Sequence, residues 1–245
     1  MPSTQSTQKT PAKPTPSAKG KAVAGPKRDA ALTRQKLIEC AERLFAEFGY
    51  AGTSIDRIAA ESGINKRMIY VYFSDKEGLY KAVLTLNFKR ALHFSQSAEK
   101  SAEPADVLLR AEELIKHYFS YLGNNPSFVR LLMRENLDGG KHAGKVLVET
   151  AAQTLDDLHG IVRTGMRQGL FRQDLDERKL VICINALCLG YFSERALLLA
   201  LWGEDITSPE VLGAMQRFIV ALVMNGIRPR PSEGAHRNAN GNPKE

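Results

Sequence analysis

Apolar side chains recur at steps of three and four residues through most of the chain, which is the spacing of one face of an α-helix. Clusters of glycine, proline and asparagine separate these stretches and mark helix ends. Residues 68–73 have the composition of a strand, but they lie between two helix-capping signals without an evident partner strand, so we interpret them as helix. The pattern therefore predicts an all-α fold of roughly nine helices. The first ends at Gly49, and the others are expected at 55–62, 66–73, 75–97, 104–122, 127–137, 142–169, 176–202 and 209–226.

Two of the short predicted helices lie on either side of a glycine turn between Gly52 and Phe73. This arrangement is typical of a helix-turn-helix, whose second helix enters the major groove of DNA. Because Ile69 and Phe73 are one helical turn apart, we expect both to pack inward, which turns two cations and an aromatic hydroxyl outward, toward phosphates and base edges. A three-helix subdomain with a solvated basic turn is the alternative interpretation. The outward positions are Lys66, Arg67, Tyr70 and Val71.

The residues around this motif form three longer patterns: Phe45-x-x-x-Gly49-Tyr50-x-Gly52-Thr53-Ser54, Ile58-Ala59-x-x-x-Gly63-Ile64 and Tyr70-x-Tyr72-Phe73-x-x-Lys76-Glu77-x-Leu79. Together these patterns resemble the TetR/AcrR family of bacterial transcriptional regulators. The resemblance covers residues 30–85, and the rest of the chain is similar in length and helical layout only. It implies an N-terminal three-helix DNA-binding domain at 29–85, with the helix-turn-helix at 54–73, and a larger helical domain at 86–228 that binds an effector and forms a dimer.

The resemblance also implies a role at the DNA for several residues of the first domain. Ser54 and Lys76 are expected to hold phosphates. Tyr70 and Tyr72 are expected to contact the DNA backbone along the edge of the groove. Arg67 suits a bidentate contact with guanine, and a phosphate contact is its open alternative. The residues expected nearest the base edges are Lys66, Arg67 and Met68.

The most apolar predicted helices are those at 176–202 and 209–226. A helix that is apolar nearly all round is buried on more than one side. The resemblance implies that this pair meets the same pair of a second subunit in a four-helix bundle. Two-fold symmetry would then place two recognition helices one turn of DNA apart, so the operator is expected to be a near-palindrome. Burial inside a monomer is the alternative.

A small-molecule effector is expected among the predicted helices at 104–122, 142–169 and 176–202. Leucine, methionine and phenylalanine dominate the surroundings, which favours a mainly apolar or aromatic ligand with a few polar anchors. Each polar side chain there could instead belong to the core or to the surface. The candidate lining residues are His117, Tyr118, Tyr121, Arg130, His159, Asn185, Tyr191 and Trp202.

The net charge of +7 is concentrated at the two ends of the chain. Residues 1–29 carry six basic side chains and one acidic one, whereas basic and acidic side chains balance between the tails. The polar composition of residues 1–28 predicts a disordered tail, which either adds non-specific affinity for DNA or serves only as a solubilising leader. Residues 229–245 are expected to form a second flexible tail.

Several classes of function are disfavoured by the sequence. The histidines and cysteines show no metal-ligand spacing and no catalytic motif is found, so we expect no metal, no cofactor and no enzyme. The N-terminus lacks a secretory signal and the longest apolar run, 180–192, is too short to cross a bilayer, which predicts a cytoplasmic protein without membrane contact. We therefore expect a homodimeric, ligand-responsive repressor. An activator or effector-independent regulator of the same fold, and a small helical enzyme or carrier protein, are the alternatives.

Overall fold

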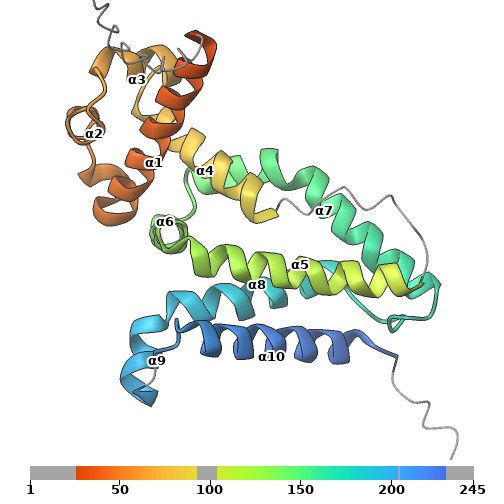
Figure 1. Ribbon diagram of the computed structural model, residues 1–245. Coiled ribbons are helices and arrows are strands. Elements are labelled where there is room, and N and C mark those ends of the chain that lie inside the picture. Colours follow the sequence, from red (N-terminus) through yellow and green to blue (C-terminus); the bar gives the residue numbers. More distant parts are fainter. Residues whose placement is uncertain (1–25, 93–103, 204, 230–245) are drawn as a thin grey trace, which may run out of the picture.

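The computed structural model describes residues 26–92, 104–203 and 205–229, and the regular secondary structure in these ranges is all α-helical (Figure 1). This confirms the predicted fold class, including helix rather than strand at 68–73. The first helices are α1 (Pro26–Gly52), α2 (Ile55–Ser62), α3 (Lys66–Phe73) and α4 (Lys76–Leu92). The second part of the chain holds α5 (Pro104–Asn124), α6 (Pro126–Leu137), α7 (Ala143–Arg167), α8 (Glu177–Ser193), α9 (Arg195–Trp202) and α10 (Pro209–Ile227).

The ends of the described ranges differ from the predicted tails in one respect. Helix α1 begins at Pro26, so residues 26–28 are helical although the sequence analysis assigned them to the disordered tail. Proline suits a first helical turn because its missing N–H has no partner to lose there. Residues 1–25 and 230–245 of the predicted tails lie outside the described residues, as do residues 93–97 at the end of the predicted helix 75–97.

The predicted helix at 176–202 is divided into α8 and α9, so the described residues form ten helices rather than roughly nine. The two axes meet at 66°. Glu194 is the junction: its backbone φ of −95° and ψ of 9° leave the helical region, and its N–H donates to the carbonyl of Gly190. Because the break contains neither glycine nor proline, the sequence gives no local signal for it.

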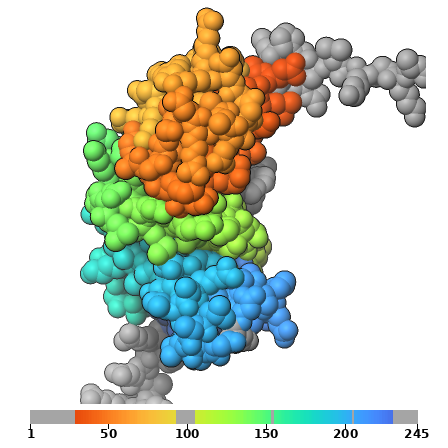
Figure 2. All heavy atoms as spheres, turned by 90° about the vertical axis from the view of Figure 1, so that its left-hand side faces the viewer, coloured from red at the N-terminus to blue at the C-terminus, as the bar shows by residue number. Residues whose placement is uncertain are grey.

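The helices are arranged in two groups that are in direct contact, α1 to α3 and α4 to α10. Helices α1, α2 and α3 gather at one end of the molecule, and α8, α9 and α10 lie at the other (Figures 1 and 2). Helix α4 packs against both α1 and α7, and α6 packs against α1. The second group is therefore in direct contact with the helices that carry the helix-turn-helix.

Gly78 holds the first turn of α4 close to the end of α3. A Cβ atom at this position would lie 1.9 Å from the carbonyl oxygen of Phe73, a backbone atom that cannot rotate away. We expect Gly78→Ala to lower the free energy of unfolding by about 1–3 kcal/mol, the usual cost of forcing extra volume into a packed site.

The matched control is Gly160→Ala in α7, where the added Cβ would meet no atom within 4 Å. Alanine is the better helix former, so this variant should be about 0.5–1 kcal/mol more stable than the parent. Urea unfolding of both variants measures the difference. Equal stabilities of the two variants would contradict the close approach of α3 and α4.

Candidate DNA-binding surface and effector cavity

Both helices of the helix-turn-helix begin at a side-chain cap. Ser54 Oγ accepts a hydrogen bond from the N–H of Arg57 at 3.1 Å and starts α2, and Asn65 Oδ1 accepts from the N–H of Arg67 at 2.9 Å and starts α3. Between them Gly63 adopts a φ of 66°, a left-handed conformation that glycine enters without strain. These three residues fix the start and the direction of α3.

One face of α3 is directed to solvent. Ile69 and Phe73 are buried, as their spacing predicted, and hold the helix on the core of the first group. On the opposite side Tyr70 is 47% exposed and Val71 63% exposed. Lys66 and Arg67 are exposed one turn earlier, so the four outward positions form a continuous surface with its cations at the helix N-terminus.

The two cations of this surface differ in their partners. Lys66 Nζ lies 2.6 Å from Asp56 Oδ1 on α2, and this hydrogen bond raises the pKa of the Lys66 ammonium. The guanidinium of Arg67 makes no ion pair within the described part of the chain. Arg67 is therefore the cation that can reach a base edge without first breaking a contact.

Of the remaining predicted DNA contacts, three are half-buried and one is exposed. Met68 is half-buried, and the half-buried ring of Tyr72 packs edge-on against Phe73. Lys76 Nζ lies 4.3 Å from the centre of the Tyr50 ring, and partial burial lowers the pKa of its ammonium. Ser54 is exposed, with one lone pair already used in capping α2. Without DNA, Lys76 therefore lies against the Tyr50 ring, which is part of the contact between the two helix groups.

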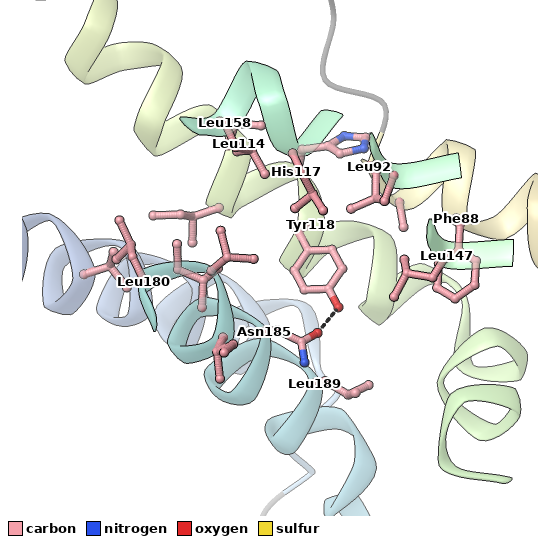
Figure 3. Close-up of a pocket in the computed structure, with 18 of the residues that line it drawn as sticks. Phe88, Leu92, Leu114, His117, Tyr118, Leu147, Leu158, Leu180, Asn185 and Leu189 are labelled. Carbon is pink, nitrogen blue, oxygen red and sulfur yellow. Dashed lines mark hydrogen bonds between the residues drawn. The ribbon is translucent and has the colours of Figure 1, made fainter. Parts of the chain in front are cut away.

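A cavity of about 520 Å³ lies within the second group, between α4, α5, α7 and α8 (Figure 3). This volume is in the range of sites for small molecules. Its walls are mainly aliphatic and aromatic, with Phe88, Leu114 and Leu147 among them. Tyr118 donates a hydrogen bond from its hydroxyl to Asn185 Oδ1 at 2.6 Å, which joins α5 to α8 across the cavity (Figure 3).

The structure brings some of the predicted effector residues together and separates others. His117, Tyr118 and Asn185 line the cavity. The other candidates do not line it, and most of them have partners elsewhere. The hydroxyl of Tyr121 donates to Asn87 Oδ1, that of Tyr191 donates to the carbonyl of Ile206, His159 lies 3.8 Å from Glu177, and both Arg130 and Trp202 are exposed.

A buried carboxylate that the sequence analysis missed forms part of the cavity wall. Glu135 Oε1 accepts from the hydroxyl of Tyr80 at 2.7 Å, and Oε2 accepts from the N–H groups of His142 at 3.0 Å and Ala143 at 2.9 Å. Burial alone would raise the pKa of Glu135, but these hydrogen bonds outweigh it and hold the pKa below its ordinary value. The available signal was its position, seven residues after the buried Phe128 on the same face of α6.

The neighbours of Glu135 extend to the DNA-binding helices. The centre of the Tyr80 ring lies 5.1 Å from the centre of the Tyr50 ring, against which Lys76 Nζ also packs. On the other side of α6, the guanidinium of Arg134 donates to the carbonyls of Ala46 at 3.1 Å and Glu47 at 2.7 Å, near the end of α1. Two adjacent residues of α6 therefore make different contacts: Glu135 lines the cavity, and Arg134 bonds to α1, one of the DNA-binding helices.

Glu135→Gln should destabilise the protein by about 1–3 kcal/mol near neutral pH, because the glutamine NH2 group cannot accept and must face a donor that the carboxylate satisfied. A carboxyl with a lowered pKa stabilises the fold above its unfolded pKa, about 4.3, and this contribution disappears as the pH falls through the folded value. The difference between parent and variant should therefore shrink below about pH 4. Urea unfolding across this range measures it.

The control for this prediction is Glu149→Gln, which changes an exposed glutamate on α7. It should leave the free energy of unfolding within about 0.5 kcal/mol of the parent. A Glu135→Gln variant as stable as this control would show that the hydrogen bonds of Glu135 contribute nothing.

An apolar surface at the other end of the molecule lacks a partner within the described residues. Ile182 on α8 is 64% exposed, and Phe218 and Leu222 on α10 are 62% and 49% exposed. By length and composition α10, and α8 with α9 as a bent pair, could also cross a membrane, although core helices of soluble proteins pass the same test. Exposed apolar side chains on neighbouring helices are a feature of surfaces that contact another molecule.

A chain that presents a basic recognition helix at one end and encloses a ligand-sized cavity near the other has the layout of a DNA-binding regulator with an effector site. Comparison with known proteins agrees with this class. Residues 37–83 match the family described as bacterial regulatory proteins, tetR family, and residues 108–223 match the tetracyclin repressor-like C-terminal domain. The chain therefore belongs to the tetR family, whose members are transcriptional regulators and not enzymes.

Individual relatives support this assignment. The transcriptional repressor NicS of Pseudomonas putida is 31% identical over 199 residues, which cover 80% of this chain and 92% of NicS. The transcriptional regulator RutR of Escherichia coli is 24% identical over 206 residues, covering 83% and 95%. The structure of the fatty acid degradation regulator FadR from Bacillus halodurans superposes with a TM-score of 0.62 at 20% identity, over 79% of this chain and 99% of FadR, which establishes a shared fold.

Proposed function

We propose that this regulator is a homodimeric repressor that binds a near-palindromic operator and is released from it by a small molecule. The observation that carries the proposal is the exposed face of α3, where Arg67 and Tyr70 stand free of the core at the helix that a helix-turn-helix inserts into the major groove. The assignment as a repressor is supported by the name of NicS, a relative over nearly its whole length.

Each residue of the DNA-binding surface takes the role that its exposure permits. Arg67 reads a base edge, for which a guanine O6 and N7 pair suits its fork of donors. Tyr70, Lys66 and Lys76 contact phosphates, Lys66 after exchanging Asp56 for the DNA. The other members of the predicted set, Ser54, Met68 and Tyr72, line the edges of this contact.

The dimer forms through the exposed apolar faces of α8 and α10. A two-fold axis at this surface makes the contact self-complementary, so each contact between two residues occurs twice. It also sets two copies of α3 about 34–36 Å apart, one turn of DNA, which gives the operator its near-palindromic form. A second copy of the chain, rather than a lipid bilayer, covers α10, and the protein acts on DNA in the cytoplasm.

The ligand acts through α4 and α6, the helices that belong to both contacts. Phe88 of α4 and Glu135 of α6 line the cavity, while Lys76 of α4 and Arg134 of α6 touch the DNA-binding helices. A ligand that favours a different position of these helices than DNA does will lower operator affinity by the coupling free energy, typically about 1–3 kcal/mol.

Fluorescence anisotropy of the full-length protein tests the proposal on duplexes from the DNA upstream of its own gene, with a random duplex as control and at two salt concentrations. We expect the upstream duplex to bind at least about 10³-fold more tightly than the random one. Equal affinity for both duplexes with the same steep salt dependence would indicate only non-specific phosphate contact and would contradict sequence-specific binding.

A further inference from the structure

Two polar side chains in the wall of the cavity, Glu135 and His117, are already bonded to the protein itself. Both oxygens of Glu135 accept hydrogen bonds, as described above, and His117 Nε2 lies 2.9 Å from the carbonyl oxygen of Arg90. The pair of Tyr118 and Asn185 is different. The tyrosine hydroxyl uses its only proton on Asn185 Oδ1, which leaves a lone pair on that hydroxyl and the two N–H groups of the asparagine amide.

The Asn185 amide nitrogen makes no hydrogen bond to the described part of the chain. It belongs to a residue that lines the cavity, beside the tyrosine oxygen (Figure 3). Burial raises the pKa of Tyr118 well above its ordinary value, so this hydroxyl stays neutral at physiological pH. The free groups at this position are therefore one neutral acceptor and a neutral amide donor: a ligand hydroxyl can pair with both, and a ligand carbonyl oxygen can accept from the amide.

The charge of the walls decides which ligands can enter. No lysine or arginine is among the cavity-lining residues in the described ranges, and the one carboxylate, Glu135, is ionised. An anionic ligand would meet no lysine or arginine among the described residues of the apolar wall and would lie near a charge of the same sign. A cationic ligand gains little from Glu135, because the protein already satisfies both of its oxygens.

We infer that the effector of this regulator is an uncharged, mainly apolar molecule whose carbonyl or hydroxyl oxygen accepts a hydrogen bond from the Asn185 amide, beside Tyr118. The inference rests on the proposed function, since it names the ligand class for the cavity of the proposed repressor. It selects neutral ketones, esters and alcohols, and it excludes carboxylates and ammonium compounds with the same apolar body.

Matched probes test this ligand class by displacement of Nile red from the full-length protein in the absence of DNA. One series has a linear body: lauryl alcohol, methyl laurate, laurate and laurylammonium, each below its micelle concentration. The other is bicyclic: acetonaphthone, naphthoate and naphthylmethylammonium. In at least one series we expect the neutral members to bind at least about tenfold more tightly than both charged members, a difference of about 1.4 kcal/mol. A carboxylate that binds as tightly as the neutral probes, or no binding in either series, would overturn the inference.

The variant Asn185→Leu keeps the volume of the side chain and removes the amide. It should weaken the preferred neutral probe at least about tenfold and leave the weak binding of the charged probes unchanged. Tyr121→Phe is the control, because this tyrosine also lies on α5 but its hydroxyl bonds to Asn87 and does not line the cavity. Equal affinity of the parent and Asn185→Leu for the neutral probe would contradict the contact.

The same probes separate the ligand class from the proposed function. Displacement is measured without DNA, so selective binding of neutral probes supports the ligand class whatever happens at the operator. If a bound neutral probe leaves operator affinity unchanged in the anisotropy assay, that result counts against a ligand-released repressor and not against the chemistry of the cavity.

Discussion

Phe218→Glu combined with Leu222→Glu is expected to convert the dimer to a monomer and to weaken operator binding by a factor of about 10²–10⁴. The two side chains are one turn apart on α10 and are among the most exposed apolar residues of the chain. Because the proposed contact is self-complementary, the double variant would bring four glutamates into one apolar interface, where buried unpaired charges and like-charge repulsion cost several kcal/mol.

The loss of affinity follows from losing the second half-site. In the dimer, the second α3 binds at the high effective concentration set by the first, and a monomer forfeits this gain without losing any contact of its own. Analytical ultracentrifugation gives the mass and anisotropy the affinity. The fold of the subunit should survive, because exposed substitutions usually change stability by less than about 0.5 kcal/mol.

Leu137→Glu is the matched control for the dimer variant. Leu137 is 88% exposed at the end of α6, so the same kind of substitution falls on an apolar side chain that belongs to neither α8 nor α10. This variant should remain a dimer with unchanged affinity for the operator. A double variant on α10 that also remains a dimer would place the contact between subunits elsewhere.

Arg67→Ala should reduce affinity for the operator far more than Lys66→Ala does, although each removes one positive charge from the same end of α3. A bidentate contact with a base is worth about 1–3 kcal/mol, and the dimer makes it twice, so a loss of about 30-fold to 10⁴-fold is expected. Lys66 must first give up its ion pair with Asp56, so its net contribution is smaller.

The salt dependence and the sequence preference distinguish the two roles. Loss of a phosphate contact lowers the salt slope and leaves the sequence preference unchanged, as expected for Lys66→Ala. Loss of a base contact relaxes the preference for one base pair in each half-site, as expected for Arg67→Ala. Anisotropy against a set of operators changed at single positions measures this preference. If Arg67→Ala kept the sequence preference of the parent, Arg67 would be a phosphate contact, which is the alternative that the sequence analysis left open.

Much of the fold could be predicted because its signals are local. Gly63 ends α2 in a left-handed conformation, and Asn65 caps α3, as their residue types indicate. Ile69 and Phe73 pack inward from spacing alone. These short-range rules were sufficient to orient α3, and therefore to predict which of its side chains face solvent.

Contacts between distant segments were beyond the sequence. The ion pair from Lys66 to Asp56 joins two helices across a turn. The break between α8 and α9 at Glu194 contains neither glycine nor proline, the residues that most disfavour helix. Glu135 looked like an ordinary charged residue, because its partners Tyr80 and His142 come from other helices. A polar residue on the buried face of a helix is the one signal that could have drawn attention to it.

Which residues line the cavity also could not be predicted from the sequence. A tyrosine on an apolar helix face can turn into a cavity, toward a neighbouring backbone or to solvent, and only packing decides. Tyr118 faces Asn185 in the cavity, whereas Tyr121, less than one helical turn further, bonds to Asn87, and Tyr191 bonds to a carbonyl after α9. Residue type and helix assignment could not separate these three.

Selection of binding sites from a pool of random DNA duplexes by the full-length protein tests the central claim most directly. A homodimer that reads DNA with α3 predicts an enriched near-palindrome, with half-site centres one helical turn, about 34–36 Å, apart. The Phe218→Glu, Leu222→Glu variant should fail to enrich the paired site. Enrichment of a single asymmetric site by the parent protein, or no enrichment at all, would contradict the account.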